Sequence, residues 1–187
     1  MRIIAGTARG RSLQGPKHSG LRPTSDRVRQ VLFDLLGQRF DGGAVLDLYC
    51  GTGALALEAL SRGCSEALLV DSDGAALDLA TANAAALGFG RAVTVRKLAL
   101  PEGLTALPPV PRRLVFADPP YAGSTAPLET LLRWVGLSGI LLPGGSLVIE
   151  ASRHGNLDPA ACTPSTLAHR LTRRVGDTVL HLFQRGP

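Results

Sequence analysis

The chain has no paired cysteine pattern, no histidine cluster and no long apolar run, and each absence excludes a class of protein. Its three cysteines are widely spaced and form no CxxC pair, which argues against a disulfide framework and against a zinc cluster. Its four histidines are scattered without ligand spacing, so no metal site is expected. No apolar run reaches the roughly 18 residues of a membrane span, and the N-terminus lacks a signal-peptide pattern. We therefore expect a cytoplasmic protein with no membrane partner.

The hydrophobic content is high enough for one sizeable core. The chain has 187 residues, of which 45% are hydrophobic, and a chain of this length buries roughly 70% of its extended surface on folding. It therefore needs neither disulfides nor metals to hold its fold. The sequence shows no second interface pattern, and we expect a monomer.

The positive charge is concentrated in the first fifth of the chain. Residues 1–40 hold eight basic and two acidic residues, whereas the remaining 147 residues hold twelve basic and thirteen acidic ones. A localised basic segment is typical of a protein that binds a polyanion. The alternative is a solvated basic face on a protein from an arginine-rich proteome, because eighteen of the twenty cations are arginines. We therefore expect residues 1–40, a basic hairpin and helix, to bind a polyanion, and residues 41–187 to form the nearly neutral main domain.

The hydrophobic pattern predicts an α/β fold. Residues 1–14 are expected to form a β-hairpin, and the apolar spacing of residues 26–40 predicts a helix capped by Thr24 or Ser25. Short apolar runs then alternate with helical stretches, which indicates a doubly wound, mostly parallel sheet. The seven expected strands lie at 44–48, 67–71, 92–96, 113–118, 146–151, 166–174 and 178–184, with the last two forming a C-terminal antiparallel hairpin. The loop 99–112, between the third and fourth of these strands, is expected to be irregular.

The first functional motif follows the strand 44–48. The chain turns through Cys50-Gly51-Thr52-Gly53 and enters a helix near Ala54. Glycines allow the backbone to approach a ligand closely, and a helix N-terminus presents free N–H groups. Asp71 ends the next strand, where its carboxylate can accept hydrogen bonds from both hydroxyls of a ribose. Together these residues predict a site for a nucleoside-containing cofactor without specifying which one.

The motif Asp118-Pro119-Pro120-Tyr121 indicates which kind of reaction the cofactor serves. It ends the fourth strand at the carboxyl edge of the sheet, where open α/β folds bind their ligands. Asp118 and the Pro119 carbonyl can each accept an N–H from an exocyclic amine, which leaves the nitrogen lone pair directed at an electrophile. Tyr121 offers a flat face for a base removed from its stack. A rigid turn without function is the plain alternative for this motif taken alone.

These motifs, in this order, resemble the class I S-adenosylmethionine-dependent methyltransferases that modify amino groups. The stretches RIIAGTARGRSL, GLRPTSDRVRQVLFDLL and LDLYCGTGALALEALSRG are similar to those of RsmD, the bacterial 16S rRNA (guanine-N2)-methyltransferase family, over nearly the whole chain. The resemblance implies methylation of a guanine in 16S rRNA, within the 30S subunit or an assembly intermediate. It also implies that residues 1–40 dock the RNA and that residues 41–187 form the methyltransferase domain. It also implies S-adenosylmethionine as cofactor and S-adenosylhomocysteine as product.

The resemblance places the site residues. The implied catalytic residues are Asp118, Pro119, Pro120 and Tyr121. The implied cofactor-binding residues are Asp47, Tyr49, Gly51, Thr52, Gly53, Asp71, Ser72, Leu98 and Ala99. The arginines that we expect to contact RNA phosphates are Arg9, Arg11, Arg22, Arg27 and Arg29.

The chain departs from this family pattern at one place. Leu98 and Ala99 stand where many relatives carry an acid or Asn for the adenine amino group, so that side-chain contact is missing.

Three other readings remain open at this stage. A methyltransferase acting on DNA, or on adenine N6 in another RNA, would share the catalytic loop, although DNA enzymes usually carry a separate recognition domain. An NAD-dependent reductase would share the glycine loop and Asp71, but the chain has no Tyr-x-x-x-Lys pair. A non-catalytic RNA-binding protein would explain the charge but not the Asp-Pro-Pro-Tyr motif.

Overall fold

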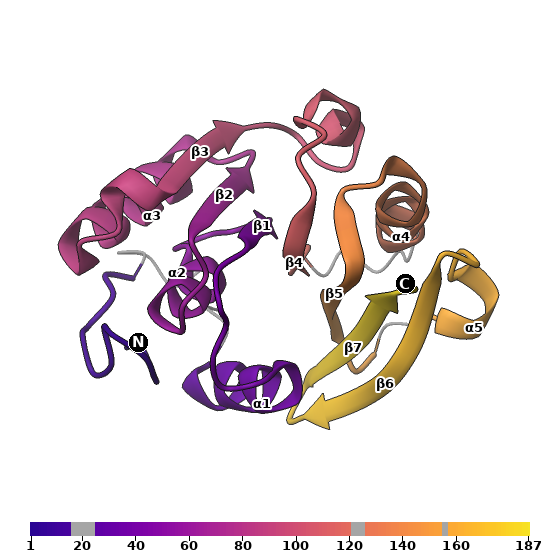
Figure 1. Cartoon of the computed structure of the whole chain (residues 1–187), viewed down its shortest axis with the longest axis horizontal. Coiled ribbons are helices and arrows are strands. Elements are labelled where there is room, and N and C mark those ends of the chain that lie inside the picture. Colours follow the sequence, from indigo (N-terminus) through magenta and orange to yellow (C-terminus); the bar gives the residue numbers. More distant parts are fainter. Residues whose placement is uncertain (16–24, 121–125, 155–156) are drawn as a thin grey trace.

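A single seven-stranded sheet forms the centre of the computed structural model, which describes residues 1–15, 25–120, 126–154 and 157–187. Its strands are β1 (Ala44–Leu48), β2 (Glu66–Asp71), β3 (Val93–Lys97), β4 (Arg112–Ala117), β5 (Leu141–Ser152), β6 (Leu167–Val175) and β7 (Thr178–Arg185). They lie side by side in the order β3-β2-β1-β4-β5-β7-β6 (Figure 1). The first five strands are parallel, whereas β7 runs antiparallel to both β5 and β6. The predicted mostly parallel sheet with a C-terminal antiparallel hairpin is confirmed.

Helices cover both faces of this sheet. They are α1 (Asp26–Leu36), α2 (Ala54–Ser61), α3 (Gly74–Leu87), α4 (Ala126–Ser138) and α5 (Pro159–Cys162), with short 3₁₀ helices η1 (Gly90–Ala92) and η2 (Glu102–Ala106). Buried side chains of α1, α2 and α3 form one core cluster, and those of α4 and η2 belong to a second. Figure 1 shows the corresponding helices on opposite sides of the strands. Every residue of β1 is buried, which explains its unalternated apolar sequence. No helix in the described ranges is long and apolar enough to span a membrane.

Local chemistry sets where α1 begins and ends. The Ser25 side chain accepts a hydrogen bond from the Val28 N–H at 3.2 Å, so the helix starts where the capping residue predicts. It stops at Leu36 because Gly37 takes a positive φ of 107°. The predicted helix over 26–40 is therefore too long at its C-terminal end. The loop 99–112 likewise contains η2, where only irregular chain was expected.

The N-terminal arm, residues 1–14, forms a hairpin turn held by one antiparallel bridge between Arg2 and Ser12 rather than by two strands. Ile3 and Leu13 are buried in the same core cluster as α1, α2 and α3. The Ser61 hydroxyl, at the end of α2, donates to the Ala5 carbonyl at 2.6 Å and accepts from the Ala8 N–H at 3.0 Å. The arm is thus packed directly against α2.

A buried carboxylate in α2 completes this attachment. The Glu58 side chain accepts hydrogen bonds from the backbone N–H groups of Ile4 at 2.7 Å and Ala5 at 3.0 Å. It also pairs with the Arg62 guanidinium at 2.8 Å, and both side chains are completely buried. The Arg62 guanidinium lies over the ring of Phe33 in α1. Glu58 therefore links the arm, α1 and α2 through one desolvated charge network.

Replacing Glu58 by Gln tests this linkage. The variant leaves the Arg62 cation buried without its partner, and breaking a buried pair in this way costs about 3 to 5 kcal/mol. We expect that loss in the free energy of unfolding, measured by urea denaturation. Asp177→Asn is the control, because the Arg153–Asp177 pair is exposed and should change stability by less than about 1 kcal/mol. Equal losses in the two variants would contradict a special role for Glu58.

Candidate active site

The loop between β1 and α2 adopts the conformation that close ligand approach requires. Gly53, the N-cap of α2, has a φ of 76° and no side-chain cap hydrogen bond. A Cβ at Gly53 would lie 2.8 Å from Leu69 and 3.2 Å from Ala80, so only glycine fits there. A Cβ at Gly51 would meet no atom within 4 Å, so the space beside this residue is open. The loop therefore presents accessible backbone at the positive end of a helix.

Asp71 holds this loop in place from the end of β2. One of its carboxylate oxygens accepts the Gly51 N–H at 2.9 Å, and the other accepts the Asp73 N–H at 3.0 Å. The side chain is half-buried, and its carboxylate retains acceptor positions beyond these two bonds. Ser72 follows it and is exposed. The expected ribose-binding role of Asp71 stays a prediction, and the structure adds that the same residue orders the glycine loop.

Asp47 lies beneath the loop, in β1, and is almost completely buried. Its carboxylate accepts the Ala56 N–H at 3.1 Å and so caps the first turn of α2 from another element. Burial raises the pKa of Asp47 well above its ordinary value, the Ala56 N–H opposes this, and the carboxylates of Asp118 and Asp71 raise it further. Asp47 in β1, Asp71 at the end of β2 and Asp118 just after β4 therefore lie at one edge of the sheet, near enough for the charges of Asp71 and Asp118 to act on Asp47.

Asp118 reaches the same edge because β4 lies beside β1. Ala117 is paired with Leu48 in the sheet, and the Asp118 N–H donates to the Leu48 carbonyl at 3.4 Å. The Asp118 side chain is half-buried, Pro119 is buried and Pro120 is exposed. The predicted catalytic loop is thus placed directly next to the predicted cofactor loop. Tyr121 lies outside the described residues.

The remaining cofactor candidates lie around the same loop. Tyr49 has a φ of 60°, which is unusual for a residue with a side chain, and it packs with Leu98 against the second core cluster. The Leu98 N–H donates to the Asp71 carbonyl at 3.0 Å, and the Ala99 carbonyl accepts from Gly103. Thr52 is buried, and its carbonyl accepts from the Asn83 side chain. The structure therefore joins Leu98 directly to Asp71, and the cofactor contacts of all these candidates stay predictions.

Cys50 within the loop is not a reactive thiol. Its side chain is buried, and burial together with the carboxylates of Asp47 and Asp71 raises the pKa of the thiol. A thiol that stays protonated is a poor nucleophile. Its position in the loop is consistent with simple packing.

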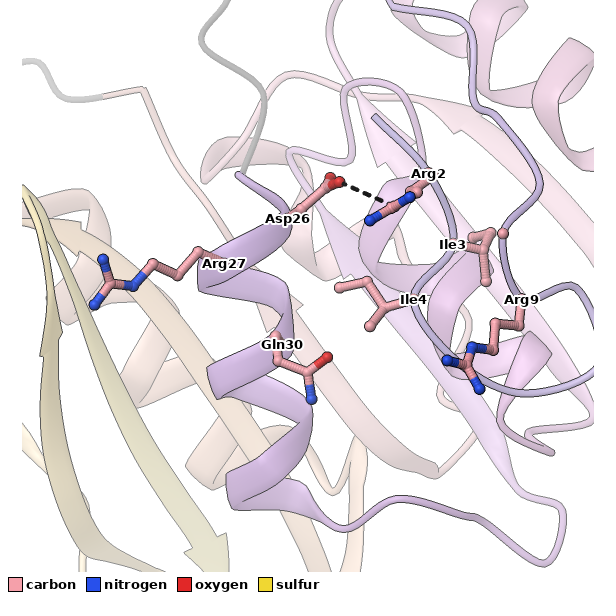
Figure 2. Close-up of a pocket in the computed structure, with 8 residues that line it drawn as sticks. Arg2, Ile3, Ile4, Arg9, Asp26, Arg27 and Gln30 are labelled. Atoms are coloured by element: carbon pink, nitrogen blue, oxygen red, sulfur yellow. Dashed lines mark ion pairs between the residues drawn. The ribbon is translucent and has the colours of Figure 1, made fainter.

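The five expected RNA-contacting arginines do not share one environment. Arg9 and Arg27 line a cavity of about 470 Å³ between the arm and α1 (Figure 2). The Arg11 guanidinium donates to the carbonyls of Ala86 and Leu87 in the last turn of α3, a structural role that the sequence did not predict. Arg29 is completely buried and donates to the Arg2 carbonyl and to Asp26, so the expected phosphate contact of Arg29 is wrong. Arg22 lies outside the described residues.

The fold and the site together define a class I S-adenosylmethionine-dependent methyltransferase. The chain belongs to the family described as "Conserved hypothetical protein 95", whose model matches residues 1–184.

Curated relatives and solved structures agree with this assignment. The chain is 34% identical over 185 residues to "Ribosomal RNA small subunit methyltransferase D" of Escherichia coli K12. The aligned region covers 99% of this chain and 90% of the relative. It is 35% identical over 159 residues to YlbH of Bacillus subtilis, described as a candidate rRNA methyltransferase, covering 84% of this chain and 85% of the relative. The solved structure of yhhF from Escherichia coli, described as a candidate methyltransferase, has a TM-score of 0.82 at 32% identity, covering 100% of this chain and 98% of that one.

The raised pKa of Asp47 predicts a pH-dependent cost to stability. Below the ordinary pKa, Asp47 is protonated in both the folded and unfolded states and contributes nothing. As the pH rises above it, the unfolded state loses the proton while the folded state keeps it, so stability falls until the folded pKa is reached. Asp47→Asn keeps the acceptor for Ala56 and removes this cost.

Urea unfolding of the two cofactor-free proteins checks this expectation. From about pH 4 to about pH 8, the stability of Asp47→Asn relative to the unsubstituted protein should increase steadily, because only the unsubstituted protein has to keep a buried carboxyl protonated. Asp78→Asn is the control, because Asp78 is an exposed acid of α3. A difference that stays constant with pH would contradict the expectation.

Proposed function

We propose that this protein transfers a methyl group from S-adenosylmethionine to the N2 amine of a guanine in 16S rRNA of the small ribosomal subunit. The observation that carries the proposal is the register of β4 beside β1, which sets Asp118-Pro119-Pro120 next to the glycine loop held by Asp71. The name of the Escherichia coli relative supports the choice of small-subunit rRNA. The resemblance described above supports guanine N2 as the acceptor.

The residues present fit the cofactor in shape and in charge. Open space beside Gly51 admits a ligand next to the backbone, and the carboxylates of Asp71 and Asp118, at the same edge of the sheet, favour a cation. S-adenosylmethionine is cationic at its sulfonium and supplies an electrophilic methyl group when bound. Asp71 would hold its ribose, and Asp47, fixed through Ala56, would orient its methionine end.

The role of the catalytic loop follows from its acceptors. The Asp118 carboxylate and the Pro119 carbonyl would each accept one N–H of the guanine amine, which directs the nitrogen lone pair toward the methyl carbon. Alignment of the reacting atoms then supplies much of the rate. The methylated amine is acidic and can lose its proton after transfer, so no strong general base is required. Tyr121 would stack on the flipped guanine.

Methylation of DNA, or of adenine N6 in another RNA, is the alternative that shares this catalytic loop. Transfer of labelled methyl groups to 30S subunits, naked 16S rRNA and DNA, followed by nucleoside analysis, separates these substrates. We expect N2-methylguanosine, with 30S subunits or an assembly intermediate as acceptor. Labelled adenine, or labelled DNA alone, would contradict the proposal. A monomer acting in the cytoplasm remains our expectation.

Replacing Asp118 tests the proposed amine contact. Asp118→Ala removes one of the two acceptors, and we expect kcat for methyl transfer to 30S subunits to fall by about 100-fold or more, in the range seen for a lost positioning contact. Asp118→Asn keeps an acceptor oxygen and should retain at least about tenfold more activity than the alanine variant. Calorimetric binding of S-adenosylhomocysteine should be preserved in both. Normal methyl transfer by Asp118→Ala would refute this role.

A further inference from the structure

The cavity between the arm and α1 carries an excess of positive charge. Arg2 and Arg9 from the arm line it together with Asp26 and Arg27 from α1. Figure 2 shows Arg2, Arg9 and Asp26 around a gap whose apolar wall includes Ile4, whereas the Arg27 side chain points to the other side of α1. Arg2 and Arg9 therefore share a cavity of about 470 Å³ with one acid, and Arg27 adds a third cation at its border. A recess of this charge favours an anionic ligand.

The single acid does not neutralise these cations. Asp26 is already bound to the buried Arg29 at 2.8 Å, whereas its distance to Arg2 is 3.9 Å. The Arg2 side chain is 72% exposed, and an exposed pair of that length contributes little to stability. Within the described part of the chain, neither Arg9 nor Arg27 forms an ion pair. The guanidinium groups are thus available to a ligand at small cost.

The positive surface continues from α1 onto the C-terminal hairpin. In Figure 2 the Arg27 side chain extends from α1 toward the C-terminal strands, and α1 packs against β6. Arg173 of β6 is paired with Leu180 of β7, and residues that face each other across strands lie on the same side of the sheet. Leu180 belongs to the core cluster that contains α1. Arg173 is therefore an exposed cation on the side of the sheet that α1 covers.

The arm is held rigidly enough to position these charges. The Ile4 and Ala5 N–H groups are fixed to Glu58, and the Ala8 N–H is fixed to Ser61. Arg2 and Arg9 lie close to these anchors in the chain. Preorganised cations bind with a smaller loss of conformational entropy than mobile ones. The arm is thus suited to hold a ligand in a defined register relative to α2.

We propose that Arg2 and Arg9 in the cavity, together with Arg27 and Arg173 on the other side of α1, form a phosphate-binding surface, called the groove below, for a single-stranded segment of the substrate RNA. This inference rests on the proposed function, and it deepens it by naming the surface on which the RNA backbone lies. The set of arginines expected to contact phosphates therefore changes. Arg11 and Arg29 leave it because they have structural partners, and Arg2 and the distant Arg173 join it. Contacts to phosphates position the RNA, and the choice of base is left to the catalytic loop.

The salt dependence of RNA binding tests the groove. The double variant Arg9→Gln/Arg173→Gln removes one cation from the arm and one from β6. Its matched control is Arg96→Gln/Arg133→Gln, because Arg96 lies on β3 at the opposite edge of the sheet and Arg133 lies on α4. Affinity for 16S rRNA is measured by filter retention between about 50 and about 200 mM salt.

We expect the slope of log affinity against log salt to become shallower by about 1.4 in the groove variant, or about 0.7 for each lost phosphate contact. The control should keep the original slope. In the methyl-transfer assay with 30S subunits, the groove variant should raise KM and leave kcat unchanged, because these contacts are formed equally before and during reaction. Binding of S-adenosylhomocysteine and the urea midpoint should match those of the unsubstituted protein.

The outcomes separate the groove from the proposed function. An unchanged slope in the groove variant, or an equal decrease in the control, would overturn the groove even if the unsubstituted protein methylates 30S subunits normally. Failure of the unsubstituted protein to methylate RNA would instead contradict the proposed function, while the binding slopes would still decide whether the groove holds RNA.

Discussion

The buried carboxylate of Glu58 is the interaction on which the arrangement of the N-terminal third depends. It accepts two backbone N–H groups of the arm and pairs with Arg62, which in turn lies against Phe33 of α1. A charge removed from water is stable only when its partners are complete. The arm, α1 and α2 therefore have to be assembled together, since each supplies part of the environment of the same charge pair.

Helix α2 connects this network to the site. Its N-terminus follows Gly53 and is capped from below by Asp47, whereas Glu58 and Ser61 in its second half hold the arm. An eight-residue helix is only about 12 Å long. The cofactor loop and the basic arm are thus fixed to opposite ends of one short, completely buried element. The separation between the arm and the glycine loop is therefore set by the length of α2.

The parallel sheet and the two functional loops could be predicted because their signals are local. Unalternated apolar runs identify buried strands, and Gly51, Gly53 and the Pro119-Pro120 pair mark loops at strand ends. The environment of each arginine could not be predicted, because it depends on partners that are distant in sequence. The Arg29 guanidinium donates to the Arg2 carbonyl, 27 residues away, and the Arg11 guanidinium donates to the Leu87 carbonyl, 76 residues away. The end of α1 was predictable, because Gly37 follows the last apolar residue of the helix pattern and glycine at that place is a local stop signal.

The charges of the molecule are divided between two places, and this division follows the chemistry of the two substrates. Asp71 and Asp118 lie at the carboxyl edge of the sheet, and burial, together with their charges, raises the pKa of the neighbouring Asp47. Arginines line the cavity between the arm and α1 instead. Two neighbouring carboxylates attract a sulfonium and repel phosphates, so the RNA backbone is favoured beside the arm and disfavoured at this edge of the sheet. A guanine base is neutral, and it is the part of the RNA that can enter the acidic site without electrostatic penalty.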